Sequence, residues 1–409
     1  MTPAKNQMRR IIGVDLHPDS FAAAQVSGST IAEMRIEKRF TKVPCSDWEK
    51  FLQKQIPPGS IIVCEAGCNS FEFMRIAERF GHQTFVLNSK SVAQLGKAYC
   101  KNDPHDALRC AKVYLCGLAS HIWQPDEETV LRREIYSAYQ QAVTDHTRAN
   151  NRIKSFLTGH KIRLNKDQKL RKALTRQSVF EAYQWSESQR FVLQSLFLDL
   201  DRAAEKRREY LEFIGKTVLQ YPMMTQLMQL CGIRLLTAYC IVAVIGDINR
   251  FESPKQLVAY LGLAPCVKAS GNSTASCGMM DGGKTQAKSA LVQAAHAILK
   301  SKNASGAALK EWGIKLKMRR SIHVAVGGVA RKLAIATWYA MKGLLPDLLD
   351  TEDVIRNKFK KIAEELTEEV ILKIGYKAVK DFVEEYTGLI LLGRFTLFKE
   401  NPHLSRQIV

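Results

Sequence analysis

Residues 10–27 read RIIGVDLHPDSFAAAQVS, and this stretch decides the fold of the first part of the chain. Its first half is apolar up to Asp15 and predicts a buried strand. The second half and the segment IAEMRIEKRF at 31–40 predict two more strands, which form a meander with the first. A further apolar run, IIVCE at 61–65, predicts another buried strand that also ends in an acid.

Helical and strand patterns alternate after this meander. We expect helices over about 46–55, 70–80 and 104–118, and a strand at TFVL, 84–87. A strand meander followed by alternating strands and helices is the order expected of a ribonuclease-H-like layer fold. The sequence therefore predicts an α/β domain of this type over residues 1–122.

The rest of the chain is predicted to be mainly helical. Proline is absent from 127 to 220 and glycine is scarce, which favours long helices over residues 123–221. A domain at 222–345 then opens with two short helices about a glycine turn, resembling a helix–hairpin–helix. It continues with a loop rich in Gly, Ser and Lys at 257–286 and with helices at about 287–300 and 323–341. Residues 346–409 are charged and predict a helical extension.

The composition points to a polyanionic partner. Sixty Lys and Arg against 40 Asp and Glu give a formal net charge of +20, which favours phosphate contacts. Nucleic acid fits this charge better than a membrane surface, because no run of 18 apolar residues could cross a bilayer. The first residues lack the apolar core of a signal peptide, so we expect a cytoplasmic, nucleoid-associated protein whose ten cysteines are reduced thiols.

Four acidic residues occur at positions where an exposed surface location does not readily explain a charged side chain. Asp15 and Glu65 end apolar strands, where a charge costs free energy unless it is paired or coordinated. Asp103 and Asp106 are spaced i, i+3 at the start of a predicted helix and therefore share one face. If the two strands are neighbours and the helix crosses their ends, the four carboxylates converge. Such a group prefers a hard cation, and we expect Mg²⁺ or Mn²⁺ as cofactor.

Simpler roles compete with this interpretation. Asp103 before Pro104 is also a helix N-cap arrangement with proline in the first turn. Asp15 alone could end a strand at a turn, and Glu65 alone could form an ordinary ion pair. A GVD strand before a hairpin also occurs in actin-like sugar kinases, but those enzymes need further glycine-rich phosphate loops, which we do not find in this sequence.

A second candidate group is the serine-rich loop KASGNSTASCG at 268–278. Ser270, Ser273 and Ser276 are candidate nucleophiles, although a serine-rich loop is usually only a turn. Lys268, Lys284 and the neighbouring glycines suit a close approach to phosphate. A hydroxyl attacks phosphorus only when it is oriented and loses its proton, and no His/Asp dyad lies beside these serines. A metal site, a lysine or a substrate oxygen would have to activate it.

A strongly basic segment runs from 148 to 176, with ten Lys or Arg and a single acid. Such a helical face is often only solvated, but it is also the pattern of a phosphate-backbone footprint. The candidate nucleic-acid contacts are Arg148, Arg152, Lys154, Lys161, Arg163, Lys268 and Lys284.

Several motifs in a fixed order resemble a known family. They are GVDLHPDSF at 13–21, VCEAGCNSFEF at 63–73, KNDPHDALRCAKVY at 101–114, YLGLAPCVKASGNS at 260–273 and GGKTQAKSALVQAA at 282–295. Together they resemble the DEDD transposases of the insertion-sequence one-ten family. These are bridge-RNA-guided serine recombinases, and they include site-specific DNA invertases. The resemblance covers roughly residues 11–341.

The resemblance implies both an architecture and a chemistry. It implies a RuvC-type (Holliday-junction-resolvase-like) domain, a long coiled-coil linker and a C-terminal transposase domain. It assigns the metal-binding acids to Asp15, Glu65, Asp103 and Asp106, and the serine that links covalently to cleaved DNA to Ser270. The implied partners are donor and target DNA, a noncoding bridge RNA that selects them by base pairing, and further copies of the chain in a dimer of dimers.

Three other functions stay open at this stage. An invertase of the same family would act without a guide RNA, and sequencing RNA that copurifies with the protein separates it from a guided recombinase. A junction-resolving nuclease would use the acids alone and would keep its cleavage when Ser270 is replaced. A non-catalytic nucleic-acid binder would lose nothing but affinity when Asp15 is replaced.

Overall fold

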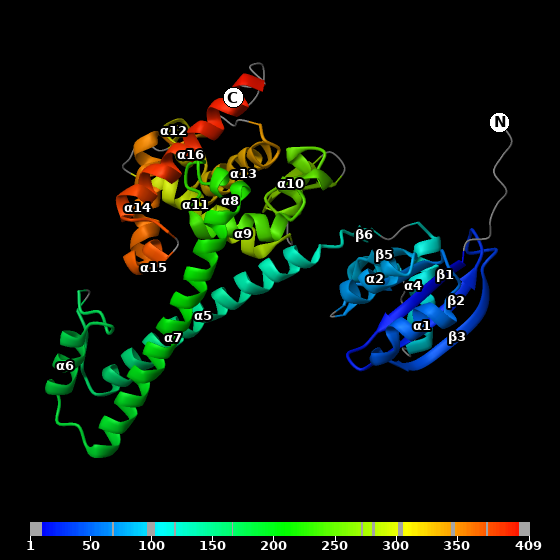
Figure 1. Cartoon of the computed structure of the whole chain (residues 1–409), viewed down its shortest axis with the longest axis horizontal. Coiled ribbons are helices and arrows are strands. Elements are labelled where there is room, and N and C mark those ends of the chain that lie inside the picture. Colours follow the sequence, from blue (N-terminus) through cyan, green and yellow to red (C-terminus); the bar gives the residue numbers. More distant parts are fainter. Residues whose placement is uncertain are drawn as a thin grey trace. The chain divides into compact units, whose positions relative to one another are not determined.

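The computed structural model of the protein describes residues 10–67, 69–95, 103–117, 120–165, 167–270, 273–279, 283–301, 306–344, 348–373 and 375–400. The chain divides into two compact units, residues 1–126 and residues 127–409 (Figure 1). The segments 222–345 and 346–409, and all but the first four residues of the segment 123–221, which sequence patterns separate, therefore lie within one unit. No helix in the described residues is long and apolar enough to cross a membrane.

The first unit is built on one six-stranded mixed sheet. Its elements are β1 (Arg10–Leu16), β2 (Ser20–Ser27), β3 (Arg35–Pro44), η1 (Cys45–Asp47), α1 (Trp48–Gln55), β4 (Ile61–Glu65), α2 (Ser70–Arg79), β5 (Gln83–Leu87), α3 (Ser89–Leu95), α4 (Asp103–Leu115) and β6 (His121–Ile122). The strand order is β3-β2-β1-β4-β5-β6. The strands β1, β2 and β3 form the predicted antiparallel meander, while β4 pairs in parallel with both β1 and β5. The predicted α/β layer is confirmed.

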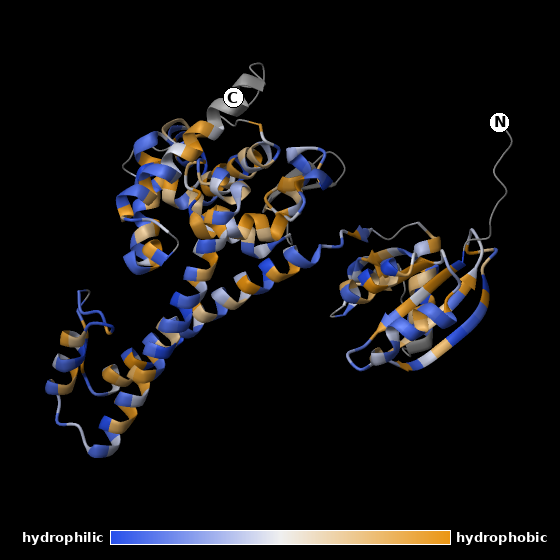
Figure 2. Cartoon of the chain, in the orientation of Figure 1, coloured by the Kyte–Doolittle hydropathy of each residue, from blue (hydrophilic) through white to orange (hydrophobic). Residues whose placement is uncertain are grey.

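The alternation of side chains along β1 places one helical layer on each face of the sheet. Ile12 and Val14 pack on one face with α1 and α2. On the opposite face Ile11 packs with residues of α3 and α4. The edge strand β3 is mostly exposed and hydrophilic (Figure 2). The central strands are therefore covered on both sides, which explains their nearly unbroken apolar sequence.

The second unit is mainly helical. Its elements are α5 (Glu127–Gly159), α6 (Ala173–Glu181), α7 (Glu187–Gln220), α8 (Pro222–Leu227), α9 (Leu235–Ile245), η2 (Ile248–Arg250), α10 (Pro254–Tyr260), β7 (Pro265–Ser270), β8 (Ser273–Met279), α11 (Thr285–Lys300), α12 (Ala307–Arg319), α13 (Ile322–Met341), α14 (Glu352–Leu366), α15 (Glu368–Lys373) and α16 (Val379–Glu400). The long helices α5 and α7 lie along one another (Figure 1). At one end they enclose a small core with α6, centred on Ile153, Trp185 and Leu193.

Two expectations for this unit need correction. The Gly/Ser/Lys-rich segment predicted as a loop contains a two-stranded antiparallel hairpin, β7–β8. Ser, Thr and Gly residues occur in loops as well as in short strands, so the composition of this segment did not predict the two strands. The structure also contains a helix that was not predicted from the sequence. This helix, α12, lies between the two helices predicted at about 287–300 and 323–341. The two short helices about a glycine turn are α8 and α9, with Gly232 at φ +75° between them.

The C-terminal extension belongs to the core of the second unit. Phe359 of α14 and Phe382 of α16 are fully buried in the same cluster as Leu230 and Leu333. The ammonium group of Lys358 donates hydrogen bonds to the carbonyl oxygens of Met228 and Leu230, both at 2.7 Å. Removing these helices would therefore expose apolar surface and leave buried polar groups without partners.

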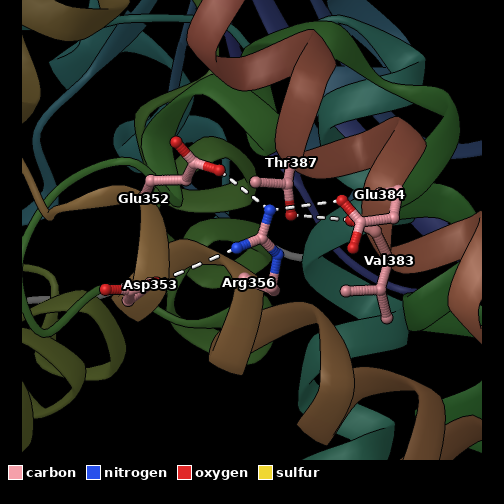
Figure 3. A network of polar contacts seen from close by, with 6 residues as sticks. All are labelled: Glu352, Asp353, Arg356, Val383, Glu384 and Thr387. Atoms are coloured by element: carbon pink, nitrogen blue, oxygen red, sulfur yellow. Dashed lines mark hydrogen bonds and ion pairs between the residues drawn. The ribbon is translucent and has the colours of Figure 1, made fainter.

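Polar contacts also tie the extension together. Figure 3 shows Arg356 of α14 between Glu352, one turn earlier, and Glu384 of α16, with nitrogen–oxygen distances of 2.8 and 3.2 Å. Lys358 pairs with the buried Asp350 at 2.7 Å. Burial lowers the pKa of Lys358, and the charge of Asp350 opposes that shift. The extension is thus held by both its apolar contacts and its ion pairs.

Replacing Phe359 with alanine should lower the free energy of unfolding of the second unit by about 3–5 kcal/mol, because it leaves a cavity where a fully buried ring stood. Denaturant unfolding followed by circular dichroism measures this. Leu389→Ala, at a side chain 53% exposed, is the matched control and should change the stability by less than about 1 kcal/mol. Equal effects of the two substitutions would contradict an extension that shares the core.

Candidate carboxylate site and serine hairpin

The register of the sheet brings two predicted acids to the same edge. In the parallel pair β1–β4, Gly13 lies opposite Val63 and Val14 opposite Cys64. One residue further on, Asp15 and Glu65 follow side by side at the carboxyl ends of their strands. Because side chains alternate along a strand, both acids lie on the face that carries Ile11 and Val63, which is the face covered by α4.

A glycine in β1 allows α4 to approach this face closely. A Cβ atom at Gly13 would lie 2.0 Å from the carbonyl oxygen of Ala107 and 2.9 Å from the amide nitrogen of Ala111. Both alanines are fully buried, one helical turn apart on α4. The helix backbone therefore rests directly on the strand, and this contact sets how near the acids of α4 come to Asp15 and Glu65.

Arg109 of α4 links two of the acids. Its guanidinium group lies 3.2 Å from a carboxylate oxygen of Asp106 and 3.8 Å from one of Glu65. The Arg109 side chain is 21% exposed, and those of Glu65 and Asp106 are 34% and 23% exposed. A cation thus already offsets part of the negative charge at this edge of the sheet.

The surroundings of the acids are partly apolar. The Nε2 atom of His17 lies 3.3 Å from a carboxylate oxygen of Asp15. Burial, together with the charges of Glu65 and Asp15, raises the pKa of the Cys110 thiol to about 12 and raises that of Cys64. Both thiols are therefore neutral at physiological pH, and they place weakly polar groups beside the carboxylates.

The donor set fits a hard divalent cation, but the described residues do not complete a metal cage. No three His, Cys, Asp or Glu side chains in the described part of the chain gather closely enough to hold a metal ion. Asp103 begins α4, one turn before Asp106, and its side chain lies outside the described residues. The structure thus brings Asp15, Glu65 and Asp106 to one edge of the sheet and leaves the fourth predicted ligand undescribed.

The candidate nucleophile lies at the end of a hairpin strand. Ser270 is the last residue of β7, and its backbone pairs with that of Ser273 at the start of β8. Ser276 lies further down β8, opposite Val267. The side chains of all three serines, and that of Lys268, lie outside the described residues. Lys284 is exposed beside the first turn of α11, with its ammonium group 5.7 Å from the ring centre of Tyr260.

The other predicted nucleic-acid contacts lie at one end of the α5–α7 pair. Arg148, Arg152 and Lys154 are exposed on α5, and Lys161 and Arg163 are exposed in the segment that follows it. Arg148 pairs with Asp145 at 3.6 Å, so part of its charge is already matched. Exposure makes these residues available to phosphate, and their role stays a prediction.

Two residues that matter for this geometry were not singled out from the sequence. The signal for Gly13 was a glycine inside an otherwise apolar strand, which marks a close backbone approach. The signal for Arg109 was its i, i+3 spacing from Asp106 in a helix. The contact of Arg109 with Glu65 could not be foreseen, because it depends on where α4 crosses the sheet.

Two parts of the chain match known protein families. Residues 12–162 match the DEDD transposase family of IS110 elements, described as "Transposase". Residues 224–311 match the family described as "Transposase IS116/IS110/IS902 family". The first match covers the strands and the helix that carry the acids, and the second covers the serine hairpin.

Curated relatives carry the same description. A putative transposase of Sinorhizobium fredii, y4qE, is 25% identical over 232 residues, which are 56% of this chain and 56% of that protein. The transposase for insertion sequence element IS1111A of Coxiella burnetii is 22% identical over 333 residues, 80% of this chain and 88% of that protein. The match therefore spans little more than half of the first relative and most of the second.

Replacing Gly13 with alanine should destabilise the first unit by about 1–3 kcal/mol or more, because the new methyl group collides with the backbone of α4. Thermal unfolding of the whole protein measures the loss. The control is Gly67→Ala, at a glycine of ordinary backbone conformation with no neighbouring atom closer than 4.0 Å. An unfolding temperature that is the same for both variants would rule out the close contact.

Proposed function

The chain belongs to the IS110 family of transposases, the insertion-sequence one-ten family, and on that premise we propose that it cleaves and joins DNA strands through Ser270. The observation that carries the proposal is the edge of the sheet where Asp15, Glu65 and α4 meet over Gly13. Asp15 and Glu65 belong to the four acids that the resemblance assigns to the DEDD set. The excess of positive charge, +20, suits a protein that works on nucleic acid.

We propose that Asp15, Glu65, Asp103 and Asp106 hold Mg²⁺ or Mn²⁺. A bound divalent ion would supply positive charge near a phosphate and so favour the extra negative charge of the transition state. The described acids are half-buried, and one of them, Asp15, is in contact with His17. Partial burial strengthens their attraction for a cation relative to fully exposed carboxylates.

The serine step conserves the bonds to phosphorus. The Ser270 hydroxyl gives up its proton as its oxygen forms a bond to a DNA phosphorus, the bond from that phosphorus to a sugar oxygen breaks, and the released sugar oxygen takes up a proton in turn. A second sugar hydroxyl then attacks the phosphoserine, joins the new strand and frees the serine. The number of phosphate ester bonds is the same before and after, so strands are exchanged without ATP.

We further propose that the protein acts on donor and target DNA as a dimer of dimers, with a noncoding bridge RNA of the element selecting both sites by base pairing. Acids of one copy and the serine of another would then form a composite site. These points rest on the resemblance of the motifs at 13–21, 63–73, 101–114 and 260–295 to the family. A site-specific invertase of the same family without a guide RNA is the alternative.

Ser270→Ala should abolish a covalent protein–DNA adduct, because it removes the oxygen that attacks phosphorus. The adduct is detected as a shifted band after denaturing electrophoresis of the protein incubated with DNA that carries the ends of the element. Ser273→Ala, on the facing strand of the same hairpin, is the control and should keep the adduct. Cleavage that persists without an adduct in the Ser270→Ala variant would favour a junction nuclease that uses the acids alone.

Arg109→Met should tighten the binding of Mn²⁺, measured by electron paramagnetic resonance of the free ion in titrations of the full-length protein. The neutral side chain no longer competes with the metal for Glu65 and Asp106, which lie 3.8 and 3.2 Å from the guanidinium. Asp15→Asn should weaken the same binding, while Asp19→Asn, at an exposed position, should not. Weaker Mn²⁺ binding by the Arg109→Met variant would show that Arg109 supports the ligands instead of competing with the metal.

A further inference from the structure

The positive charge of the chain is concentrated around the helices that follow the serine hairpin. Between residues 282 and 346 there are twelve Lys or Arg and one acid, Glu311. This segment alone carries more than half of the net charge of +20. It holds no acid at all from 312 to 346, a stretch that covers most of α12 and all of α13. A surface with so few counter-charges attracts a polyanion.

Some of these cations have partners within the protein. Lys315 pairs with Glu311 at 2.7 Å, Lys332 lies 4.7 Å above the ring of Trp312, and Lys342 donates to Asn249 at 2.9 Å. On α12, α13 and the turn between them, four others are exposed, and no acid lies within ion-pair distance of them in the part of the chain that the structure describes. These four, which we call the basic track, are Lys317, Arg319, Arg320 and Arg331.

The basic track is held on a rigid support. α12 packs on α13 through two glycines: a Cβ at Gly313 would lie 2.9 Å from Val329, and one at Gly328 would lie 2.9 Å from Trp312. The turn between the helices is capped by Ser321, whose hydroxyl accepts a hydrogen bond from the amide of Val324. Met318, in the last turn of α12, is 82% exposed. Lys317, Arg319 and Arg320 therefore lie at or next to a turn whose backbone is fixed, and Arg331 projects from α13.

The second strand of the serine hairpin ends beside α13, the helix that carries Arg331. Met279, the last residue of β8, lies against Gly327 of α13, with its sulfur 3.6 Å from the position of a Cβ there. Residues four apart on a helix share a face, so His323 and Arg331 flank Gly327 on the same side of α13. Both flanking residues are exposed. The base of the hairpin whose first strand ends in Ser270 is thus bordered by Arg331, one member of the basic track.

We propose that the basic track binds the backbone of duplex DNA next to the phosphate that Ser270 attacks. The choice of DNA rests on the proposed function, because a duplex with a phosphate at Ser270 would extend toward Arg331 at the base of the hairpin and so toward the other exposed cations of α12 and α13. A solvated basic face is the simpler alternative, but such faces on helices usually interleave acids with their cations. The absence of any acid from 312 to 346 argues against it.

The test is the salt dependence of DNA binding by the full-length protein. A fluorescein-labelled duplex of about 30 base pairs is titrated by anisotropy over a range of NaCl concentrations. Each phosphate contact contributes about 0.9 to the slope of log K against log salt. In the variant with Arg319, Arg320 and Arg331 replaced by glutamine, the slope should fall by about 2–3, and affinity at about 100 mM NaCl should fall roughly tenfold or more.

The matched control removes the same charge elsewhere in the second unit. Lys360, Lys377 and Lys380 are exposed on and beside α14 and α16, and their replacement by glutamine should leave the slope nearly unchanged. Equal losses in both variants would overturn the proposal, because net charge alone would then explain the binding. A loss confined to binding of a structured RNA of similar length would also overturn it and would assign the track to RNA.

The outcome is separable from that of the proposed function. Anisotropy reports equilibrium binding and needs no cleavage, so it can be measured in the Ser270→Ala variant. A wild-type protein that forms no covalent adduct but shows the expected difference in slopes would refute the serine chemistry and leave DNA binding by the basic track intact. A normal adduct with unchanged slopes would do the reverse.

Discussion

The contact between the backbone of α4 and Gly13 is the constraint on which the carboxylate site depends. Any side chain at residue 13 would collide with the carbonyl oxygen of Ala107, so the helix lies close to β1 only because this position is a glycine. That approach brings Asp106 to the edge where Asp15 and Glu65 follow their parallel strands. Three carboxylates from separate elements thus lie at one edge of the sheet, and strand register and the height of the helix above the sheet together determine their separation.

Neighbouring carboxylates repel one another unless a positive charge lies nearby, and Arg109 provides such a charge within the protein. Arg109 contacts Glu65 and Asp106 while α4 packs on the sheet, so the fold does not require a metal ion to offset this repulsion. The same contact implies competition, since a divalent ion and a guanidinium cannot occupy the same carboxylate oxygens. Arg109 therefore reduces the repulsion between Glu65 and Asp106, and the same contacts would compete with a metal ion for these two carboxylates.

How much could be predicted from the sequence differs between the two candidate groups. The strands that end in Asp15 and Glu65 were predicted because buried parallel strands are unbroken apolar runs, and their adjacency follows from the order of a meander and an α/β crossover. The height of α4 above the sheet could not be predicted, because it depends on contacts such as Gly13 with Ala107 between distant segments. The serine segment was predicted as a loop and contains a hairpin, since Ser, Thr and Gly occur in both. Of residues 312–346, only the helix at about 323–341 was predicted, and the charge of this segment emerges only when acids are counted along with cations.

The core of the second unit supports the base of the serine hairpin. The base of the hairpin rests on α13, and α13 contributes Val329 and Leu333 to the same core as Phe359 and Phe382 of the C-terminal extension. The core that supports the serine thus extends over more than a hundred residues beyond it. A perturbation of α14 or α16 weakens the support of α13, so residues far from the chemistry influence the position of the hairpin. The C-terminal extension is therefore linked to the base of the serine hairpin through the packing of the core that it shares with α13.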